Sequence, residues 1–331
     1  MKKTIIIAEA GVNHNGSLKL AKKLVDIASK SGSDYVKFQT FKSDLVFSKS
    51  TPKAEYQKKN TSNKITALQM AKNLELNKTQ HANLAKYCKK KKIGYLTTFH
   101  DIKSLMDYKK YKIDYIKIGS GDINNLPYLH EVSKINKKVI LSTGLSNLKE
   151  VKKAIKILTR KKLSKKDLIV LHCNSAYPTP LKDVNLNVMK TLKKLGTKVG
   201  YSDHTTGIEV SIAAASMGAE VIEKHFTINK KLKGPDHKAS LEPQELFKMV
   251  KLIRNIDIAK GSSIKKPTPS ELINKKMVRK SIVAIKKIKK GETFDKTNIF
   301  IKRPAIGISP MKFFQILGKK AKKEYKIDDL I

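Results

Sequence analysis

The chain has 331 residues, of which 40% are hydrophobic, so it can bury a large core and disorder is not expected. No apolar run approaches the roughly 20 residues needed to span a bilayer, and two cysteines, Cys88 and Cys173, give neither a disulfide framework nor a metal cluster. The first residues, MKKTIIIAEAG, resemble a signal peptide only superficially, because the apolar run stops at Glu9 without a cleavage region. We therefore expect a cytoplasmic globular protein whose first buried strand lies here.

The formal net charge of +42 is the most unusual bulk property. A positive field of this size attracts polyanions, so nucleic acid or an anionic membrane has to be considered. Lysines provide nearly all of the charge, however, and they are spread along the chain at helical-surface spacings such as Lys19, Lys22 and Lys23, without interleaved aromatic residues. No nucleic-acid-binding module is recognisable. We interpret the charge as a solvated surface that assists capture of a small anionic substrate, and expect neither nucleic acid nor membrane as partner.

Short apolar, β-rich runs alternate with longer amphipathic stretches from residue 5 to about 225. The expected strands are Ile5–Glu9, Tyr35–Gln39, Gly94–Thr98, Tyr115–Ile118, Val139–Ser142, Leu168–Leu171, Lys198–Tyr201 and Val221–Lys224. The expected helices include Leu18–Lys30, Thr79–Lys91, Asn147–Thr159, Gly207–Met217 and Pro243–Ile256. Eight strands joined by long crossovers imply parallel neighbours, and eight such units in roughly 250 residues predict a closed (β/α)8 TIM barrel. An open doubly wound sheet is disfavoured because no glycine-rich dinucleotide fingerprint follows the first strand.

Two segments depart from this alternation. Thr40–Ile65 is a long polar insertion after the second strand, which we interpret as a lid or a partner-contact loop. A stretch rich in Gly, Ser, Lys and Pro begins at Ala259, and after it Ser281–Ile285 and Asn298–Lys302 indicate short strands. We therefore divide the chain into a barrel at 1–258, a linker at 259–278 and a β-rich domain at 279–331, which is too small to be very stable alone.

Polar side chains follow every expected strand at its C-terminal end, where a TIM barrel builds its active site. Lys37 and Lys117 each lie within an otherwise apolar strand, and a lysine is almost never buried without a partner. Either they pair with Glu9 or Glu223, or they clamp a phosphate or carboxylate. Hydroxyl donors at the same level favour the anion site; these are Thr98, Ser120, Ser142, Ser175 and Ser202.

His204 and His225 follow consecutive strands, so their imidazoles can converge. Two imidazoles with open positions suit a divalent ion that binds a substrate oxygen; Mn²⁺ is expected, with Mg²⁺ or Co²⁺ as alternatives. Weaker candidates are His14, His100 and His172. Glu9 and Asp236, the latter in GPDHKAS after the last strand, are placed to bind hydroxyls or a metal-bound water.

These strand-end residues lie in segments that resemble the sialic acid synthase family, which makes N-acetylneuraminate from phosphoenolpyruvate and N-acetylmannosamine. The matching segments run in order through essentially the whole chain: IIAEAGVNHNGS (6–17), YVKFQTFK (35–42), KAEYQKKNT (53–61), IKIGSGDINNLPYL (116–129), ILSTG (140–144), LHCNSAYPTP (171–180), GYSDHTTG (200–207), IEKHFT (222–227), GPDHKASLEP (234–243), RKSIVAIKKIKKGE (279–292) and KRPAIGISPM (302–311). The resemblance implies a barrel followed by a C-terminal SAF domain, similar to type III antifreeze protein. It also implies a domain-swapped homodimer in which that small domain covers the partner's active site.

The resemblance further implies a role for each matching position. Phosphoenolpyruvate would be held by Lys37, Thr98, Lys117, Ser120, Ser142, Ser175 and Ser202. The sugar or the reacting centre would be contacted by Glu9, Gln39, Tyr177, Glu223 and Asp236, and the metal would be bound by His204 and His225. Arg303 would reach the N-acetyl group across the dimer, a role that rests on resemblance only.

By this resemblance the metal polarises the open-chain aldehyde, the methylene carbon of phosphoenolpyruvate attacks it, water adds, and C–O cleavage expels phosphate. Glu9, Glu223 and Asp236 are the expected catalytic carboxylates, and the sequence leaves open whether Glu9 or Glu223 orients the water. N-acetylneuraminate is the first expected product. The alternative is N,N'-diacetyllegionaminate, made from 2,4-diacetamido-2,4,6-trideoxymannose.

Three places depart from the family's usual pattern: TTFHD at 97–101, Ala176 before Tyr177, and Ala305-Ile306 after Arg303-Pro304. They lie at the expected mouth, so they bear on sugar preference and activity. A catalytically inactive sugar-binding homologue is a further hypothesis, which intact Lys37, Lys117, His204 and His225 disfavour.

Overall fold

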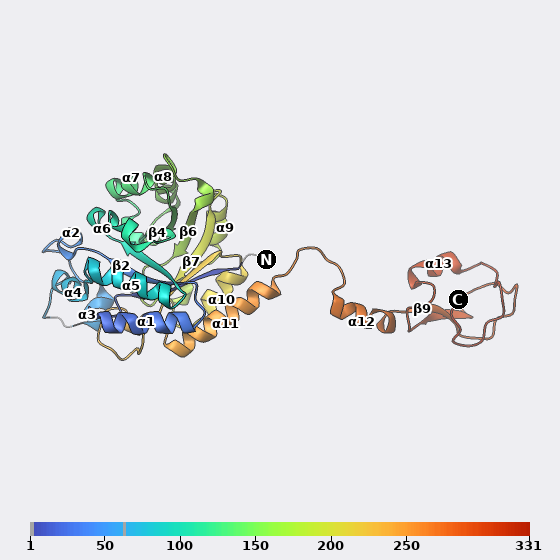
Figure 1. Cartoon of the computed structure of the whole chain (residues 1–331). Coiled ribbons are helices and arrows are strands. Elements are labelled where there is room, and N and C mark those ends of the chain that lie inside the picture. The colour runs from blue at the N-terminus through green and yellow to red at the C-terminus, as the bar shows by residue number, and fades with distance from the viewer. Residues whose placement is uncertain (1–2, 62–63) are drawn as a thin grey trace. The chain divides into compact units, whose positions relative to one another are not determined.

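A computed structural model describes residues 3–61 and 64–331 of the chain. The chain separates into two compact units, Met1–Gly261 and Ser262–Ile331 (Figure 1). No helix among the described residues combines the length and the apolar character that a membrane crossing requires.

The first unit is a closed barrel of eight parallel strands in chain order, with β8 pairing back onto β1. The strands are β1 Ile5–Gly11, β2 Tyr35–Thr40, β3 Gly94–Phe99, β4 Tyr115–Ile118, β5 Lys138–Ser142, β6 Leu168–Cys173, β7 Lys198–Asp203 and β8 Val221–His225. The predicted TIM barrel is thereby confirmed. The strand ends are the main difference from the sequence-based prediction: β1, β6 and β7 run two residues further and β2, β3 and β8 one, because the residues there, several of them polar, keep pairing with neighbouring strands.

Helices surround the barrel (Figure 1). They are α1 Leu18–Lys30, α5 Lys78–Lys90, α6 Ile102–Leu105, α7 Leu126–Ser133, α8 Leu148–Leu158, α9 Val188–Lys193, α10 Glu209–Ser216 and α11 Pro243–Ala259. Their start signals are readable: the Ser17 hydroxyl accepts the Leu20 N–H at the beginning of α1, and Asn77 begins α5 with a capping box to Gln80. Each then buries one apolar stripe on the barrel, as α1 does with Ala21, Leu24, Val25 and Ala28.

The insertion after β2 is folded rather than an open loop. It contains α2 Ser43–Val46 and α3 Glu55–Asn60, and it leads into α4 Ala67–Leu74. The Asn60 side chain donates to the carbonyl of Pro235 at 2.9 Å, and the Tyr56 ring stacks on the Tyr177 ring with centroids 5.0 Å apart. The insertion therefore contacts the two loops that follow β6 and β8, at the end of the barrel where the strands terminate.

A fully buried ion pair lies behind the ends of β7 and β8. The amino group of Lys224 is 3.0 Å from a carboxylate oxygen of Asp203, and neither side chain is exposed. Asp203 also accepts from the N–H and hydroxyl of Thr205 and from the hydroxyl of Ser211, while Lys224 donates to the carbonyl of Thr205. Because removing one partner would strand a charge in a dry site, at a typical cost of about 3–5 kcal/mol, this network fixes β7 to β8 and to α10.

The second unit has its own small core. Its elements are α12 Pro269–Val278, β9 Ser281–Ala284, β10 Ile299–Lys302 and α13 Phe313–Ile316, with β9 and β10 antiparallel. Its buried cluster consists of Ile282, Ala284, Ile288, Phe294, Ile299, Ala321 and Tyr325. Part of the segment expected as a linker is helical, since Thr268 and Glu271 form a capping box and Pro269 occupies the first turn of α12.

A buried histidine in the barrel unit predicts acid sensitivity. The Nδ1 of His81, on α5, lies 2.8 Å from the Tyr95 hydroxyl, and burial lowers the pKa of His81 to about 4. The unfolded chain, with a histidine pKa near 6.5, then binds more protons, so this contribution to stability is complete above about pH 6.5 and is lost as the pH falls toward 4.

We therefore expect the free energy of unfolding to fall in this window by up to about 1.4 kcal/mol per pH unit from this group alone. His81→Gln, which keeps an acceptor for Tyr95, should show a flatter pH dependence in urea unfolding followed by circular dichroism. His14 and His237, with pKa values lowered by burial to about 3 and about 4, stay in both proteins and contribute with the same sign. Equal slopes in the two proteins would contradict the assignment.

Candidate active site

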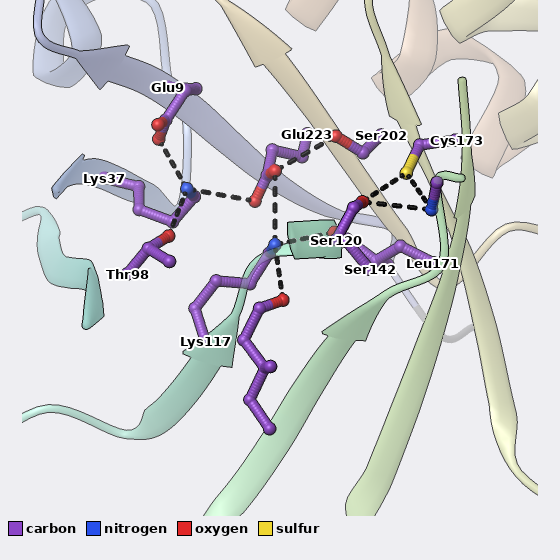
Figure 2. Close-up of polar contacts among 12 residues, drawn as sticks. Glu9, Lys37, Thr98, Lys117, Ser120, Ser142, Leu171, Cys173, Ser202 and Glu223 are labelled. Carbon is purple, nitrogen blue, oxygen red and sulfur yellow. Dashed lines mark hydrogen bonds and ion pairs between the residues drawn. The ribbon is translucent and has the colours of Figure 1, made fainter. Parts of the chain in front are cut away.

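Two buried lysines, Lys37 on β2 and Lys117 on β4, point toward Glu223 (Figure 2). The Nζ of Lys37 lies 2.8 Å from Oε2 of Glu9 and 3.7 Å from Oε2 of Glu223, and it donates to the Thr98 hydroxyl at 2.9 Å. The Nζ of Lys117 lies 3.6 Å from Oε1 of Glu223. The ion pairs expected as one alternative are thus present, and both lysines share Glu223.

Hydroxyl groups complete the surroundings of these charges. Lys117 donates to the Ser142 hydroxyl at 2.6 Å, and the Ser202 hydroxyl donates to Oε1 of Glu223 at 3.0 Å. The pleat explains the convergence: side chains two residues apart on a strand face the same side, so Lys37 with Gln39 and Glu223 with His225 all face inward.

Burial and neighbouring charges give the two carboxylates different proton affinities. Burial raises the pKa of Glu9 to about 7, and the ion pair with Lys37 only partly opposes it. Burial alone would also raise the pKa of Glu223, but Lys117 and Lys37 together hold it below its usual range. Burial lowers the pKa of Lys117, whereas Glu223 and Glu9 outweigh burial at Lys37 and raise its pKa. Glu223 is therefore the fixed negative charge of the site, and Glu9 is the carboxylate able to exchange a proton near neutral pH.

A second group of small donors lies beside the lysines, at the ends of β4, β5 and β6. The backbone N–H of Gly144 donates to the Ser120 hydroxyl at 3.0 Å and to Sγ of Cys173 at 3.1 Å. A Cβ at position 144 would lie 2.2 Å from the Ser175 hydroxyl, so only glycine lets these loops close. Ser120 and Ser175 thus come together as expected, while Cys173 joins them although the cysteines had been assigned no role at the site.

The two histidines proposed as metal ligands are close together, with ring centroids 5.6 Å apart. Nδ1 of His204 faces the carbonyl of Asn174, which can only accept, so this nitrogen carries the proton and Nε2 carries the lone pair. The Tyr177 hydroxyl donates to that Nε2 at 3.0 Å. His225 has a buried Nδ1 without a hydrogen-bond partner among the described residues.

This donor set fits a divalent cation. A neutral imidazole whose second nitrogen is held by a backbone carbonyl is the usual form of a metal ligand, and His204 has this form. In residues 3–61 and 64–331 no group of three or more His, Cys, Asp or Glu side chains is arranged to hold a metal. The protein would supply two nitrogens and leave the other positions to water and substrate oxygen.

A cavity of about 160 Å³ opens beside His225. Its polar lining includes Gln39, Tyr56, Tyr177, His225 and Asp236. The Gln39 amide donates to Oε1 of Glu9 at 3.4 Å, and burial raises the pKa of Asp236 to about 6. Three of the residues expected to contact a sugar therefore line one cavity, together with Tyr56 from the insertion, which the sequence had not suggested.

The weaker histidine candidates have other partners. His172 points away from the site and bonds the carbonyl of Val184, and Nδ1 of His14 accepts the N–H of Gly16. His100 lines the cavity and lies 3.5 Å from Asp122. Arg303 belongs to the second unit, where its side chain is exposed, so the barrel by itself does not bring it to the site.

Most of the chain matches two known protein families. Residues 24–265 match the NeuB family, and residues 279–331 match the SAF domain. The chain belongs to the NeuB family. This confirms the resemblance to the sialic acid synthases and the small C-terminal domain expected from the sequence.

Individual relatives of this NeuB-family chain span nearly its whole length. The N,N'-diacetyllegionaminic acid synthase of Campylobacter jejuni is 51% identical, over 100% of this chain and 99% of that protein. The human N-acetylneuraminate-9-phosphate synthase is 34% identical, over 98% of this chain and 90% of that protein. A crystal structure of N-acetylneuraminic acid (sialic acid) synthetase from Leptospira borgpetersenii, 35% identical, superposes with a TM-score of 0.73 over 82% of this chain and 90% of that one.

Proposed function

We propose that the chain is a nonulosonate synthase, which condenses phosphoenolpyruvate with an N-acetylated amino-sugar aldehyde and releases phosphate. The observation that carries the proposal is the pair of buried lysines, Lys37 and Lys117, ringed by hydroxyls at the end of a closed barrel. Two cations with hydroxyl donors suit a ligand that carries both a phosphate and a carboxylate. The names of two relatives, an N,N'-diacetyllegionaminic acid synthase and an N-acetylneuraminate-9-phosphate synthase, support this reaction.

In the proposed reaction the methylene carbon of phosphoenolpyruvate forms a bond to the aldehyde carbon, whose oxygen takes the carbonyl electron pair and becomes a hydroxyl. The enol-phosphate carbon becomes electron-poor, and water adds to it with loss of a proton. Cleavage of the C–O bond then expels phosphate with the bonding pair and leaves a ketone. Lys37 and Lys117 hold the phosphate and carboxylate against the charge that develops, in a site that excludes most water.

Glu9 is the better of the two carboxylates to take the proton from the attacking water. Burial brings its pKa to about 7, close to the range in which a general base works best. Glu223 instead stays ionised between Lys37 and Lys117 and orients them. The sequence alone left the choice between Glu9 and Glu223 open, and the difference between their pKa values supports Glu9.

His204 and His225 would hold a divalent ion, with Mn²⁺ as the first choice. When bound, such an ion is a Lewis acid that polarises the carbonyl of the sugar. The carbonyl of Asn174 keeps the His204 ring in the tautomer that presents Nε2, and the Tyr177 hydroxyl has to turn aside before that nitrogen can bind a cation.

For the sugar we propose 2,4-diacetamido-2,4,6-trideoxymannose, which gives N,N'-diacetyllegionaminate. The support is the 51% identity to a protein of that name over both full lengths, against 34–35% for relatives named after N-acetylneuraminate. N-acetylmannosamine, the substrate first expected from the sequence, is the second candidate. Its support is the similarity of this chain to the Leptospira N-acetylneuraminic acid synthetase, at 35% identity and a TM-score of 0.73.

The direct test is phosphate release from phosphoenolpyruvate in the presence of Mn²⁺ and each sugar, with the product identified by mass spectrometry. We expect turnover with at least one of the two sugars and a higher kcat/KM with the trideoxy sugar. If sugar binding is detected but neither sugar releases phosphate, the chain is an inactive sugar-binding homologue and the proposal fails.

We also propose that the protein is a homodimer in which Arg303 of each protomer serves the active site of the other. Arg303→Ala and Lys117→Met should each be nearly inactive alone. In a mixed dimer one site combines an intact barrel with an intact Arg303, so random mixing should restore about a quarter of the activity of the unmodified protein. Activity that stays at the level of the single variants, with mixed dimers shown by native mass spectrometry, would place Arg303 in its own protomer's site or outside any site.

A further inference from the structure

The cavity beside His225 has two unlike sides. Its polar side carries Gln39, Tyr56, Gln57, His100, Tyr177, His225 and Asp236. Its other side is apolar and is formed by Val12, Phe41, Val46, Phe47, Met70, Ala71 and Leu74, here called the apolar wall. Among these described residues the thioether of Met70 is the most polar side-chain group. The His100 ring lies at the edge of the apolar wall, with its centroid 6.2 Å from that of Phe41, and a hydroxyl facing the rest of the apolar wall meets no strong hydrogen-bonding side chain from it.

The apolar wall is a built feature and not a loose surface. Five of its members form a buried cluster separate from the barrel core, and Phe47 packs against it. The helix α4 starts with a capping box between Thr66 and Gln69, and then directs Met70, Ala71 and Leu74 inward at helical spacing. All three are at least nine-tenths buried, which fixes their position at the cavity.

We infer that the apolar wall determines sugar specificity, by receiving the methyl group at C6 of a 6-deoxy sugar and disfavouring a sugar with a hydroxyl there. This inference rests on the proposed function, since it takes the cavity as the sugar site. The aldehyde carbon C1 has to lie at the polar end, near His225, Glu9 and the lysines that hold phosphoenolpyruvate. C6 is the opposite end of the sugar and extends away from these groups, toward the apolar wall.

The chemistry of the apolar wall sets the size of the effect. A hydroxyl at C6 would give up its hydrogen bonds to water on entering, whereas a methyl group gains apolar contact. An apolar pocket discriminates only moderately against an added hydroxyl, so we expect a preference of about 10–100-fold in kcat/KM. The 4-acetamido group lies two carbons nearer the aldehyde and does not contribute to this preference.

The test compares N-acetylmannosamine with its 6-deoxy counterpart, two sugars that differ only by the hydroxyl at C6. The unmodified protein should prefer the 6-deoxy sugar. Met70→Gln keeps the length of the side chain and the helix propensity but adds an amide, so it should reduce this preference at least about five-fold by improving turnover of the 6-hydroxy sugar. Met70→Leu keeps the apolar wall apolar and should retain the preference.

Met217→Gln is the matched control, because Met217 is exposed at the end of α10 and does not line the cavity. It should change neither the preference nor the activity. Equal kcat/KM for the two sugars in the unmodified protein, or an unchanged preference in a folded Met70→Gln protein, would overturn the inference while leaving the synthase function intact. Absence of phosphate release with every sugar would instead refute the proposed function itself.

Discussion

Lys117→Met is expected to lower kcat/KM for phosphoenolpyruvate by about 10²–10³-fold, the range observed when one preorganised donor is removed from a transition-state site. Methionine nearly matches lysine in length but carries no charge. The variant removes the cation 3.6 Å from Glu223 and the donor to the Ser142 hydroxyl. Glu223 therefore loses a partner, and in the proposed reaction the phosphate would lose one as well. Initial rates of phosphate release, measured over a range of phosphoenolpyruvate concentrations, give the result.

Lys138→Met is the matched control for this change. Lys138 begins β5, at the opposite end of the strand from Ser142, and its side chain is exposed. The amino group of Lys138 lies 6.0 Å from the centroid of the Tyr115 ring, an exposed contact whose loss affects stability only slightly. The same chemical change there should leave kcat/KM within about two-fold, because Lys138 contacts no residue of the site. If a folded Lys117→Met protein kept normal kinetics, Lys117 would be only a structural partner of Glu223.

Removal of the metal is expected to abolish activity reversibly. Protein treated with a chelator should release no phosphate, and added Mn²⁺ should restore turnover. His204→Ala or His225→Ala should weaken Mn²⁺ binding by at least about 100-fold, because each removes one of the two proposed protein ligands. Loss of a residue that only hydrogen-bonds a metal ligand already weakens metal binding by about 10–100-fold. Electron paramagnetic resonance of free Mn²⁺ measures this binding without reference to activity.

His130→Ala is the control here, because His130 is exposed on α7 and contacts neither histidine of the site. It should bind Mn²⁺ as the unmodified protein does. Full activity after complete chelation, or unchanged Mn²⁺ affinity in both the His204→Ala and His225→Ala proteins, would show that the two imidazoles do not form a metal site.

The barrel was predictable because its physical cause is local. Each strand shows an apolar run, and several of the longer helices have a capping residue and a buried apolar stripe, as at Ser17 and α1. The strands were predicted too short because the prediction used only the apolar run of each strand. Asp203 and His225 read as loop residues by polarity, yet both lie inside strands, because the neighbouring strand supplies their backbone partners.

Side-chain pairing across the barrel was predictable only in part. The C-terminal ends of all eight strands lie at one end of a TIM barrel, so the polar residues there were expected to lie near one another. The structure brings Lys37, Lys117, Glu9 and Glu223 together. Which lysine pairs with which glutamate depends on barrel register, and a single sequence does not show it. The buried position of Lys224 was not predicted, because nothing in a lysine-rich sequence distinguishes it from the exposed lysines.

The apolar side of the cavity was missed for a different reason. Its residues come from the loop after β1, the segment after β2 and the helix α4, three stretches that only the folded insertion brings together. The sequence signal was present as Thr66 with Gln69 before an apolar stripe, which indicates a helix. It does not indicate what that stripe faces.

The ion pair between Asp203 and Lys224 has a consequence for how a metal ion would bind at the proposed site. Asp203 immediately precedes His204, and Lys224 immediately precedes His225, the two proposed ligands. The hydrogen-bonded ion pair therefore holds the ends of β7 and β8 together without a metal ion. In many small metalloproteins the ion supplies the energy that folds its site. Here the ion pair would hold the two proposed ligands in place before any ion arrives. We therefore expect divalent ions to exchange readily at the proposed site, so that the ion bound would depend on which ions are available in the cell.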